Sequence, residues 1–221
     1  RKAQKAIEGF KDPTGLFQVF ERNNSILVTD TQENVNRMLE VIKELDVKRV
    51  LAPDYTEASD EMKKYNKALK NKSITSELLT SDTSFTLDEI EYTVYAPKKT
   101  DYGFGNDNDF SLVTKAVHGE NTLLFTGDAM EERLNEIMDI GECTLLKVPY
   151  HGRKLENLAE FLEAVKPKCA VVCSSKSEYS SNTQGLLSKR GIPAYSTCFN
   201  GRITAVSNGK EIKMTVEKGN V

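Results

Sequence analysis

Two side chains that can bind metal ions follow two apolar, strand-like runs near the middle of the chain. Asp128 follows residues 122–125 and a Thr-Gly turn, and His151 follows residues 144–148 and a turn that begins at Pro149. A short apolar run that stops at Gly or Pro is typical of a buried strand ending at a turn. We therefore expect Asp128 and His151 at neighbouring strand ends, where oxygen and nitrogen ligands could bind zinc, manganese or iron.

Each of these residues also has a purely structural interpretation. Asp128 could cap a helix over Ala129–Asp139, since aspartate is favoured at the first position of a helix. His151 could be a partly solvated residue that bonds a nearby carbonyl group, and its loss would then cost little stability. Lys147 points inward in the strand pattern and could pair with Asp128, placing an ammonium group where a cation would otherwise bind. The sequence leaves both interpretations open.

The spacing of these groups resembles the metallo-β-lactamase superfamily, and most of all the branch of the competence-type DNA-uptake proteins. The resemblance rests on Thr126-Gly127-Asp128 after one strand and on Lys147-x-x-x-His151-Gly152 after the next. It extends in the family's order over further segments, which are residues 25–29, 47–53, 90–97 and the Asn/Asp-rich stretch 106–113. The resemblance implies an α/β protein with an αββα sandwich, of bacterial origin, from a family of metal-dependent hydrolases whose default substrate is a phosphodiester.

The chain departs from this family at the main metal-binding motif. Catalytic relatives carry His-x-His-x-Asp-His after the strand that resembles Ser25–Thr29, and the corresponding residues here are Asp30, Gln32, Asn34 and Val35. Asn34 lacks the charge of an aspartate, and Gln32 offers only a neutral amide oxygen. The resemblance therefore implies a degenerate site. Its vestigial metal ligands would be Asp30, Asp128 and His151, with Lys147, Gln32 and Asn34 beside them and no nameable catalytic residue.

Histidines are missing from the family's later motifs as well. The segment that resembles Tyr-x-His-Pro reads Tyr179-Ser180-Ser181-Asn182, and Pro149-Tyr150-His151 keeps one histidine where relatives have two. The whole chain contains two histidines, and the other one, His118, falls in an expected hairpin turn away from the strand ends. A serine nucleophile at Ser174 or Ser175 would have no second histidine to serve as its base.

Two functions remain open at this stage. The first is a pseudoenzyme that has lost its metal centre, needs no cofactor, and has a binding or structural role within a larger chain or assembly. The alternative is a metal-dependent, phosphodiester-type hydrolase with a rebuilt site, in which Asp30, Asp128 and His151 hold one Zn, Mn or Fe ion, with the Gln32 amide as a further ligand.

Composition restricts the partners without naming one. The 221 residues carry a net charge of −3 and no basic stripe interleaved with aromatics, so nothing indicates a nucleic-acid surface. No apolar run is long enough to cross a bilayer. Four cysteines lie in or beside expected strands without zinc-binding spacing, which favours buried free thiols. Either a bacterial cytoplasm or a secreted or cell-surface location fits these features.

Alternating helical and strand-like patterns predict one α/β domain over residues 1–221. The family resemblance implies that the family's first β elements are missing and that the amino end is trimmed. Lys98–Asn108 is expected to be a long surface loop near the site. The expected helices cover Lys2–Phe10, Glu33–Leu45, Ser59–Lys70, Glu131–Asp139, Leu155–Val165 and Thr183–Arg190. The expected strands cover Phe17–Phe20, Ser25–Thr29, Val50–Ala52, Ile90–Tyr95, Ser111–Ala116, Thr122–Phe125, Leu145–Val148, Ala170–Val172, Ala194–Ser196 and Ile203–Ser207.

Overall fold

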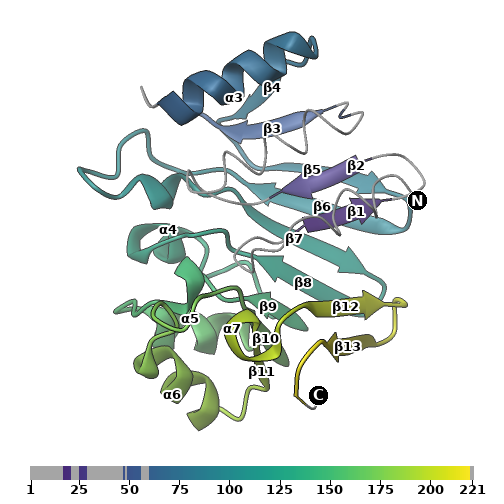
Figure 1. Ribbon diagram of the computed structural model, residues 1–221, viewed down its shortest axis with the longest axis vertical. Coiled ribbons are helices and arrows are strands. Elements are labelled where there is room, and N and C mark those ends of the chain that lie inside the picture. Colours follow the sequence, from purple (N-terminus) through teal and green to yellow (C-terminus); the bar gives the residue numbers. More distant parts are fainter. Residues whose placement is uncertain (1–16, 21–24, 29–46, 48, 56–59, 220–221) are drawn as a thin grey trace.

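A computed structural model describes residues 17–20, 25–28, 47, 49–55 and 60–219 of the protein, and its centre is a seven-stranded mixed sheet (Figure 1). The four strands at one side run parallel and the three at the other side continue the sheet as antiparallel hairpins. In sheet order the strands are β11 (Ala194–Ser196), β10 (Cys169–Val172), β9 (Leu145–Lys147), β8 (Asn121–Phe125), β7 (Val113–His118), β6 (Ile90–Tyr95) and β5 (Thr83–Leu87).

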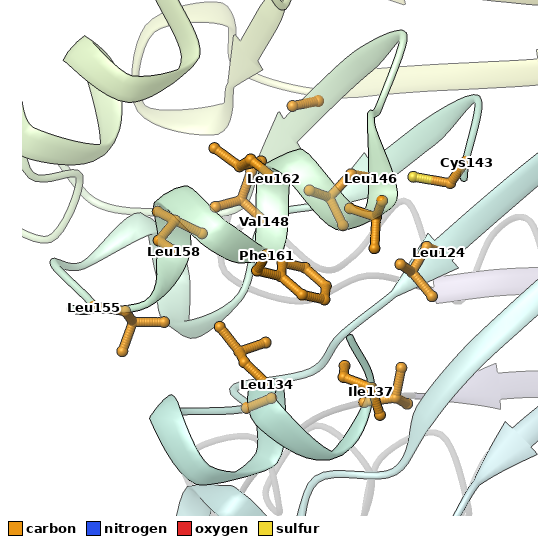
Figure 2. Close-up of a cluster of buried hydrophobic side chains, with 14 of the residues drawn as sticks. Leu124, Leu134, Ile137, Cys143, Leu146, Val148, Leu155, Leu158, Phe161 and Leu162 are labelled. Carbon is orange, nitrogen blue, oxygen red and sulfur yellow. The ribbon is translucent and has the colours of Figure 1, made fainter. Parts of the chain in front are cut away.

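Helices connect the parallel strands and cover one face of the sheet. They are α4 (Glu131–Glu136), α5 (Leu158–Val165) and α6 (Ser181–Lys189), which all lie on the same side of the strands in Figure 1. The apolar faces of α4 and α5 meet the sheet in the main core, where Phe161 lies between Leu134 and Leu146 (Figure 2). These side chains are fully buried, so the core fixes the parallel strands that carry the candidate site.

A hairpin packs on the opposite face of the sheet. It consists of β12 (Ile203–Ser207) and β13 (Ile212–Val216), preceded by the short helix α7 (Thr197–Asn200). Its apolar side chains cover the face of β9 and β10 that points away from the helices. Leu145 and Val171 on that face contact Ile203, Ile212 and Met214. The central sheet therefore has helices on one face and a β-hairpin on the other, as expected for one side of a layered α/β sandwich.

Two smaller strand pairs complete the described structure. β1 (Phe17–Phe20) and β2 (Ser25–Val28) form an antiparallel pair. β3 (Val50–Pro53) and β4 (Ser76–Leu79) are parallel and are joined by α3 (Asp60–Asn71), whose residues Ala68 and Leu69 pack on Val50. None of the described helices is long and apolar enough to span a membrane.

The structure confirms the α/β class and most of the expected elements. Three short strands were not predicted from the sequence. Polar and apolar residues alternate in β5 and β13, and β4 is the non-alternating run Ser-Glu-Leu-Leu. α4 ends at Glu136, three residues earlier than predicted, because Ile137 leaves the helical conformation. The helices expected over Lys2–Phe10 and Glu33–Leu45 lie outside the described residues. The single-domain assignment stays a prediction.

The main core generates a test of where stability resides. Leu146 is completely buried in β9, whereas Leu78 in β4 is about half exposed. We expect Leu146→Ala to lower the free energy of unfolding by about 2–5 kcal/mol, because it leaves a cavity under α5. Leu78→Ala should change it by less than about 0.5 kcal/mol. Urea titrations measure both values, and equal losses would contradict a core centred on β9.

Candidate functional site

The chain brings Asp128, Lys147 and His151 together at the carboxyl ends of two adjacent parallel strands. β8 ends at Phe125, and Asp128 follows through the turn at Thr126 and Gly127. Lys147 is the last residue of β9, and His151 lies in the short 3-10 turn η3 (Tyr150–Gly152) that follows it. All three side chains are almost completely buried, at 3–4% relative exposure. The expectation that Asp128 and His151 lie at neighbouring strand ends is confirmed.

Asp128 is bonded on both carboxylate oxygens. Lys147 Nζ lies 3.3 Å from Asp128 Oδ1 and also donates to the Gly127 carbonyl oxygen. His151 Nε2 lies 3.0 Å from Asp128 Oδ2. The contact between Lys147 and Asp128 confirms the predicted pairing. Such donors are what a buried carboxylate needs in the absence of a bound cation.

The contacts of His151 define its protonation state. Nδ1 lies 2.8 Å from the carbonyl oxygen of Cys173, which can only accept a hydrogen bond, so Nδ1 carries a proton. Nε2 faces a carboxylate, which also accepts, so Nε2 carries a second proton. Burial opposes the resulting charge, but the hydrogen bond to Asp128 and the charge of Asp128 outweigh burial and raise the pKa of His151. The charge of Lys147 also opposes protonation, but the acceptors at both ring nitrogens favour the imidazolium form.

The turn that holds His151 is strained and tightly fixed. Tyr150 and His151 have φ angles of +46° and +54°, which side chains other than glycine rarely adopt. Gly152 packs so closely on Val172 that a Cβ atom would lie 2.7 Å from its Cγ1. Ser180 N donates to Gly152 O at 3.0 Å, locking the turn to the segment before α6. Strain of this kind persists only where the surroundings enforce it, and it is commonest at functional sites.

His151 is therefore a buried part of the framework. The expectation of a partly solvated residue is wrong, since His151 is 4% exposed and has partners at both ring nitrogens, while the expected cost of removing it stays a prediction. Removing it would leave the Asp128 carboxylate buried with one cationic partner fewer, and such losses are costly.

Asp128 does not cap α4, which corrects our structural interpretation of this residue. The helix begins after Met130, and the buried Asp109 supplies the capping oxygen from a different loop. Its Oδ1 accepts from Met130 N at 2.7 Å and from Arg133 N at 3.2 Å. Burial raises the pKa of Asp109, and these two backbone bonds act in the opposite direction. Asp128 instead donates its own N–H to Ser111 Oγ at 3.2 Å.

A second buried ionic group, which the sequence analysis did not identify, lies beside the site and contacts Ser111, the residue that accepts the Asp128 N–H. Arg133 on α4 is fully buried and donates to the carbonyl oxygens of Ser111 and Tyr95, at 3.0 and 2.7 Å. It also pairs with Glu136 at 2.7 Å. The Asn/Asp-rich stretch 106–113 marked this region, but nothing in the sequence pointed to Arg133, which lies within an ordinary helical pattern.

Glu178 fixes the loop that carries the Cys173 carbonyl. Its carboxylate accepts from Ser175 N and Oγ at 2.9 and 2.7 Å and pairs with Arg153 at 2.9 Å. Burial opposes ionisation, but these bonds and the nearby charge of His151 prevail and lower the pKa of Glu178 to about 2. Ser175 is thus a hydrogen-bond donor to a carboxylate, in keeping with our rejection of a serine nucleophile.

The cysteines are free, as expected from their spacing. Cys143 and Cys173 are buried, and Cys169 and Cys198 are partly buried. Burial raises the pKa of the Cys143 thiol to about 12. Because the thiolate is the reactive form, Cys143 behaves as a small apolar side chain.

The described residues do not fit a bound metal ion. Within them no three His, Cys, Asp or Glu side chains converge on one point. Asp128 and His151 do meet, but an ammonium group contacts the carboxylate and both imidazole nitrogens carry protons. Asp30, Gln32 and Asn34 lie outside the described residues, so their roles stay predictions.

Comparisons with known proteins find a curated relative at low identity and a short family match. Over 154 residues it is 25% identical to ComE operon protein 3 of Bacillus subtilis (strain 168), a match that covers 68% of this chain. The chain spans about a fifth of the length of that relative, because the match covers 20% of it. Residues 2–50 also match the family described as the bacterial type II/III secretion system short domain.

Two solved structures resemble parts of the fold at low identity. One is described as a metal-dependent hydrolase from Parabacteroides distasonis. It is 10% identical, with a TM-score of 0.49 over 85% of this chain and 90% of that chain. The other is CmlA, a diiron beta-hydroxylase from Streptomyces venezuelae. It is 13% identical, with a TM-score of 0.43 over 71% of this chain and 40% of that chain. Likeness at this level carries no argument about activity.

The raised pKa of His151 predicts a stability that falls with increasing pH. The folded chain holds the imidazolium proton more tightly than the unfolded chain, whose histidine pKa is about 6.5. The contribution is therefore complete below about pH 6.5 and is lost as the pH rises through the higher folded value. We expect the difference in unfolding free energy between the native protein and His151→Gln to shrink from about pH 5.5 to about pH 9.

Urea titrations across this pH range measure that difference. The matched control is His118→Gln, in the last residue of β7. This variant retains His151 and should keep the native dependence of unfolding free energy on pH. A difference between native and His151→Gln that grows with pH would show that His151 is neutral in the folded protein.

Glu178 predicts an opposite dependence in acid. Because its pKa is lowered to about 2, ionised Glu178 stabilises the fold above its ordinary value of 4.5, and this contribution is lost as the pH falls toward 2. We expect the advantage of the native protein over Glu178→Gln to be constant above pH 4.5 and to shrink below it. Glu142→Gln, which removes an exposed ion pair with Lys166, is the control and should have a smaller effect. An advantage that persists unchanged near pH 2 would contradict the assignment.

Proposed function

We propose that this chain is a non-catalytic domain of metallo-β-lactamase type, in which protein cations have replaced the metal centre, and that it has a binding or structural role within a larger protein. The observation that carries the proposal is the buried group of Lys147, Asp128 and His151. Its two cationic side chains contact the carboxylate that a metal ion would otherwise need.

The charges in this group argue against a metal ion at Asp128. Lys147 and His151 supply two positive charges around one negative charge, and the Gly127 and Cys173 carbonyl oxygens each accept a further hydrogen bond from them. To bind a metal ion at Asp128, the chain would have to deprotonate His151 and displace the Lys147 ammonium group. Because both groups are buried and bonded, that rearrangement would cost several hydrogen bonds as well as a charge pair.

The same contacts remove the groups that could activate water. A general base needs a free lone pair within reach of the water it deprotonates. Among the described residues at this site, the one imidazole is doubly protonated and its carboxylate partner is engaged on both oxygens. This arrangement favours a structural role over hydrolysis.

The comparisons support a role within a larger protein. The chain aligns with a fifth of ComE operon protein 3, and its amino-terminal residues match a short domain of bacterial secretion systems. A domain of this kind would act by being held in an assembly, and the buried group of Lys147, Asp128 and His151 would serve as part of its rigid framework.

Metal analysis tests the proposal. After dialysis with zinc, manganese or iron(II), we expect less than stoichiometric metal by elemental analysis and no rise in melting temperature. A ligand that binds only the folded state would raise that temperature as its concentration increases. Asp128→Asn is the matched control, because it keeps the shape of the side chain while removing the charge.

One stoichiometric metal ion that is lost in Asp128→Asn would overturn the proposal. Hydrolysis of a generic phosphodiester by the metal-loaded protein, absent in the same variant, would then establish the rebuilt single-ion hydrolase.

A further inference from the structure

The loop that joins β6 to β7 presents a phenylalanine to solvent. Phe104 has a relative exposure of 108%, compared with 52–58% for the other exposed large apolar side chains of the described structure. The loop extends away from the body of the fold on the left of Figure 1. Gly103 and Gly105 on either side have φ angles of +83° and +80°, a conformation that lets the chain turn sharply around Phe104.

The base of this loop is fixed by buried and bonded groups. Tyr102 is 4% exposed, packs edge-on against Phe110, and donates to both Glu136 carboxylate oxygens at 2.8 and 2.9 Å. Asn106 closes the turn, since its Nδ2 donates to Tyr102 O at 2.7 Å and its backbone N–H to Gly103 O at 3.3 Å. The exposed ring is therefore carried by an anchored turn.

Such an arrangement suits binding because the cost of ordering it is already met by the fold. An aromatic ring on a rigid support buries a large apolar area and loses little conformational entropy on association. The packing of the fold does not account for a phenylalanine at this tip, since Phe104 is fully exposed.

The charge of the loop indicates the kind of partner. Residues 100–114 contain three aspartates and no lysine or arginine, and Asp101 and Asp107 are exposed on either side of Phe104. The two lysines before the loop point to α4, where Lys98 Nζ donates to Glu136 O at 2.8 Å and Lys99 pairs with Glu132. An anionic lipid surface would repel this tip, whereas a basic protein surface would attract it.

We propose that the Asp101–Asp107 loop is a docking element whose Phe104 inserts into an apolar pocket, ringed by lysine or arginine, on a partner protein. The two aspartates set the orientation and the rate of encounter, and the phenylalanine supplies the anchor. This role is separate from the buried group at Asp128, so it holds whatever the outcome of the metal analysis.

Site-specific crosslinking in cells that carry the native gene tests the proposal. A photoreactive phenylalanine analogue replaces Phe104 in the full-length protein, and the same analogue at the exposed Phe199 of α7 is the matched control. We expect one defined protein adduct from position 104 and none of it from position 199. Mass spectrometry should place the crosslink in a segment rich in lysine or arginine, and reversing the loop charge with D101K and D107K should abolish the adduct.

The affinity of the purified partner for the protein then measures the contribution of Phe104. Phe104→Ala should weaken this affinity by about 30-fold, the effect of losing a hot-spot side chain. Vesicles of phosphatidylcholine with or without about 30% phosphatidylserine should not bind.

Three results would overturn the proposal. They are identical adducts from both positions, an adduct that survives D101K and D107K, and binding to the anionic vesicles that Phe104→Ala abolishes. Unchanged melting temperatures of the variants would show that the fold is intact.

Discussion

The buried carboxylate of Asp128 imposes the main constraint on this fold. A charge at 3% exposure is tolerated only when donors surround it, and the chain supplies them from the end of β9 and the turn that follows it. Lys147 must therefore end β9 pointing inward, and the following turn must present His151 on the same side. The positive φ angles at Tyr150 and His151 are a conformational cost of that geometry. The bond from His151 to Cys173 O extends the same constraint to β10.

The parallel order of β8, β9 and β10 makes this convergence possible. Parallel neighbours bring their carboxyl ends to one edge of the sheet, so residues far apart in sequence meet there. The helical face of the sheet then holds those ends in place through a close-packed core around Phe161 and Leu146. On the other face the β12–β13 hairpin covers β9 and β10, so β9, which carries Lys147, is buried on both faces.

Two further ionic groups surround the central one and make its position rigid. Arg133 ties the ends of β6 and β7 to α4, while Asp109 caps the same helix. Glu178 holds the loop after β10 through Ser175 and Arg153. Arg133 and Glu178 are each paired with an opposite charge within the protein, and Asp109 is held by backbone N–H groups.

The sequence by itself determined the alternation of strands and helices, the strand ends that carry Asp128 and His151, and the inward direction of Lys147. These features follow from local patterns, namely apolar runs, turn residues and the two-residue period of a strand. It could not decide between a helix cap and an ion pair for Asp128, because both use the same residue at the same place. Only the tertiary structure brought Asp109 from a separate loop to cap α4, which freed Asp128 for Lys147 and His151. It alone paired the Cys173 carbonyl with His151 and so fixed the second proton on the ring, since partners 22 residues apart have no local signature. Arg133 was hidden for the same reason, because burial of a helical arginine depends on carbonyl groups that other strands provide.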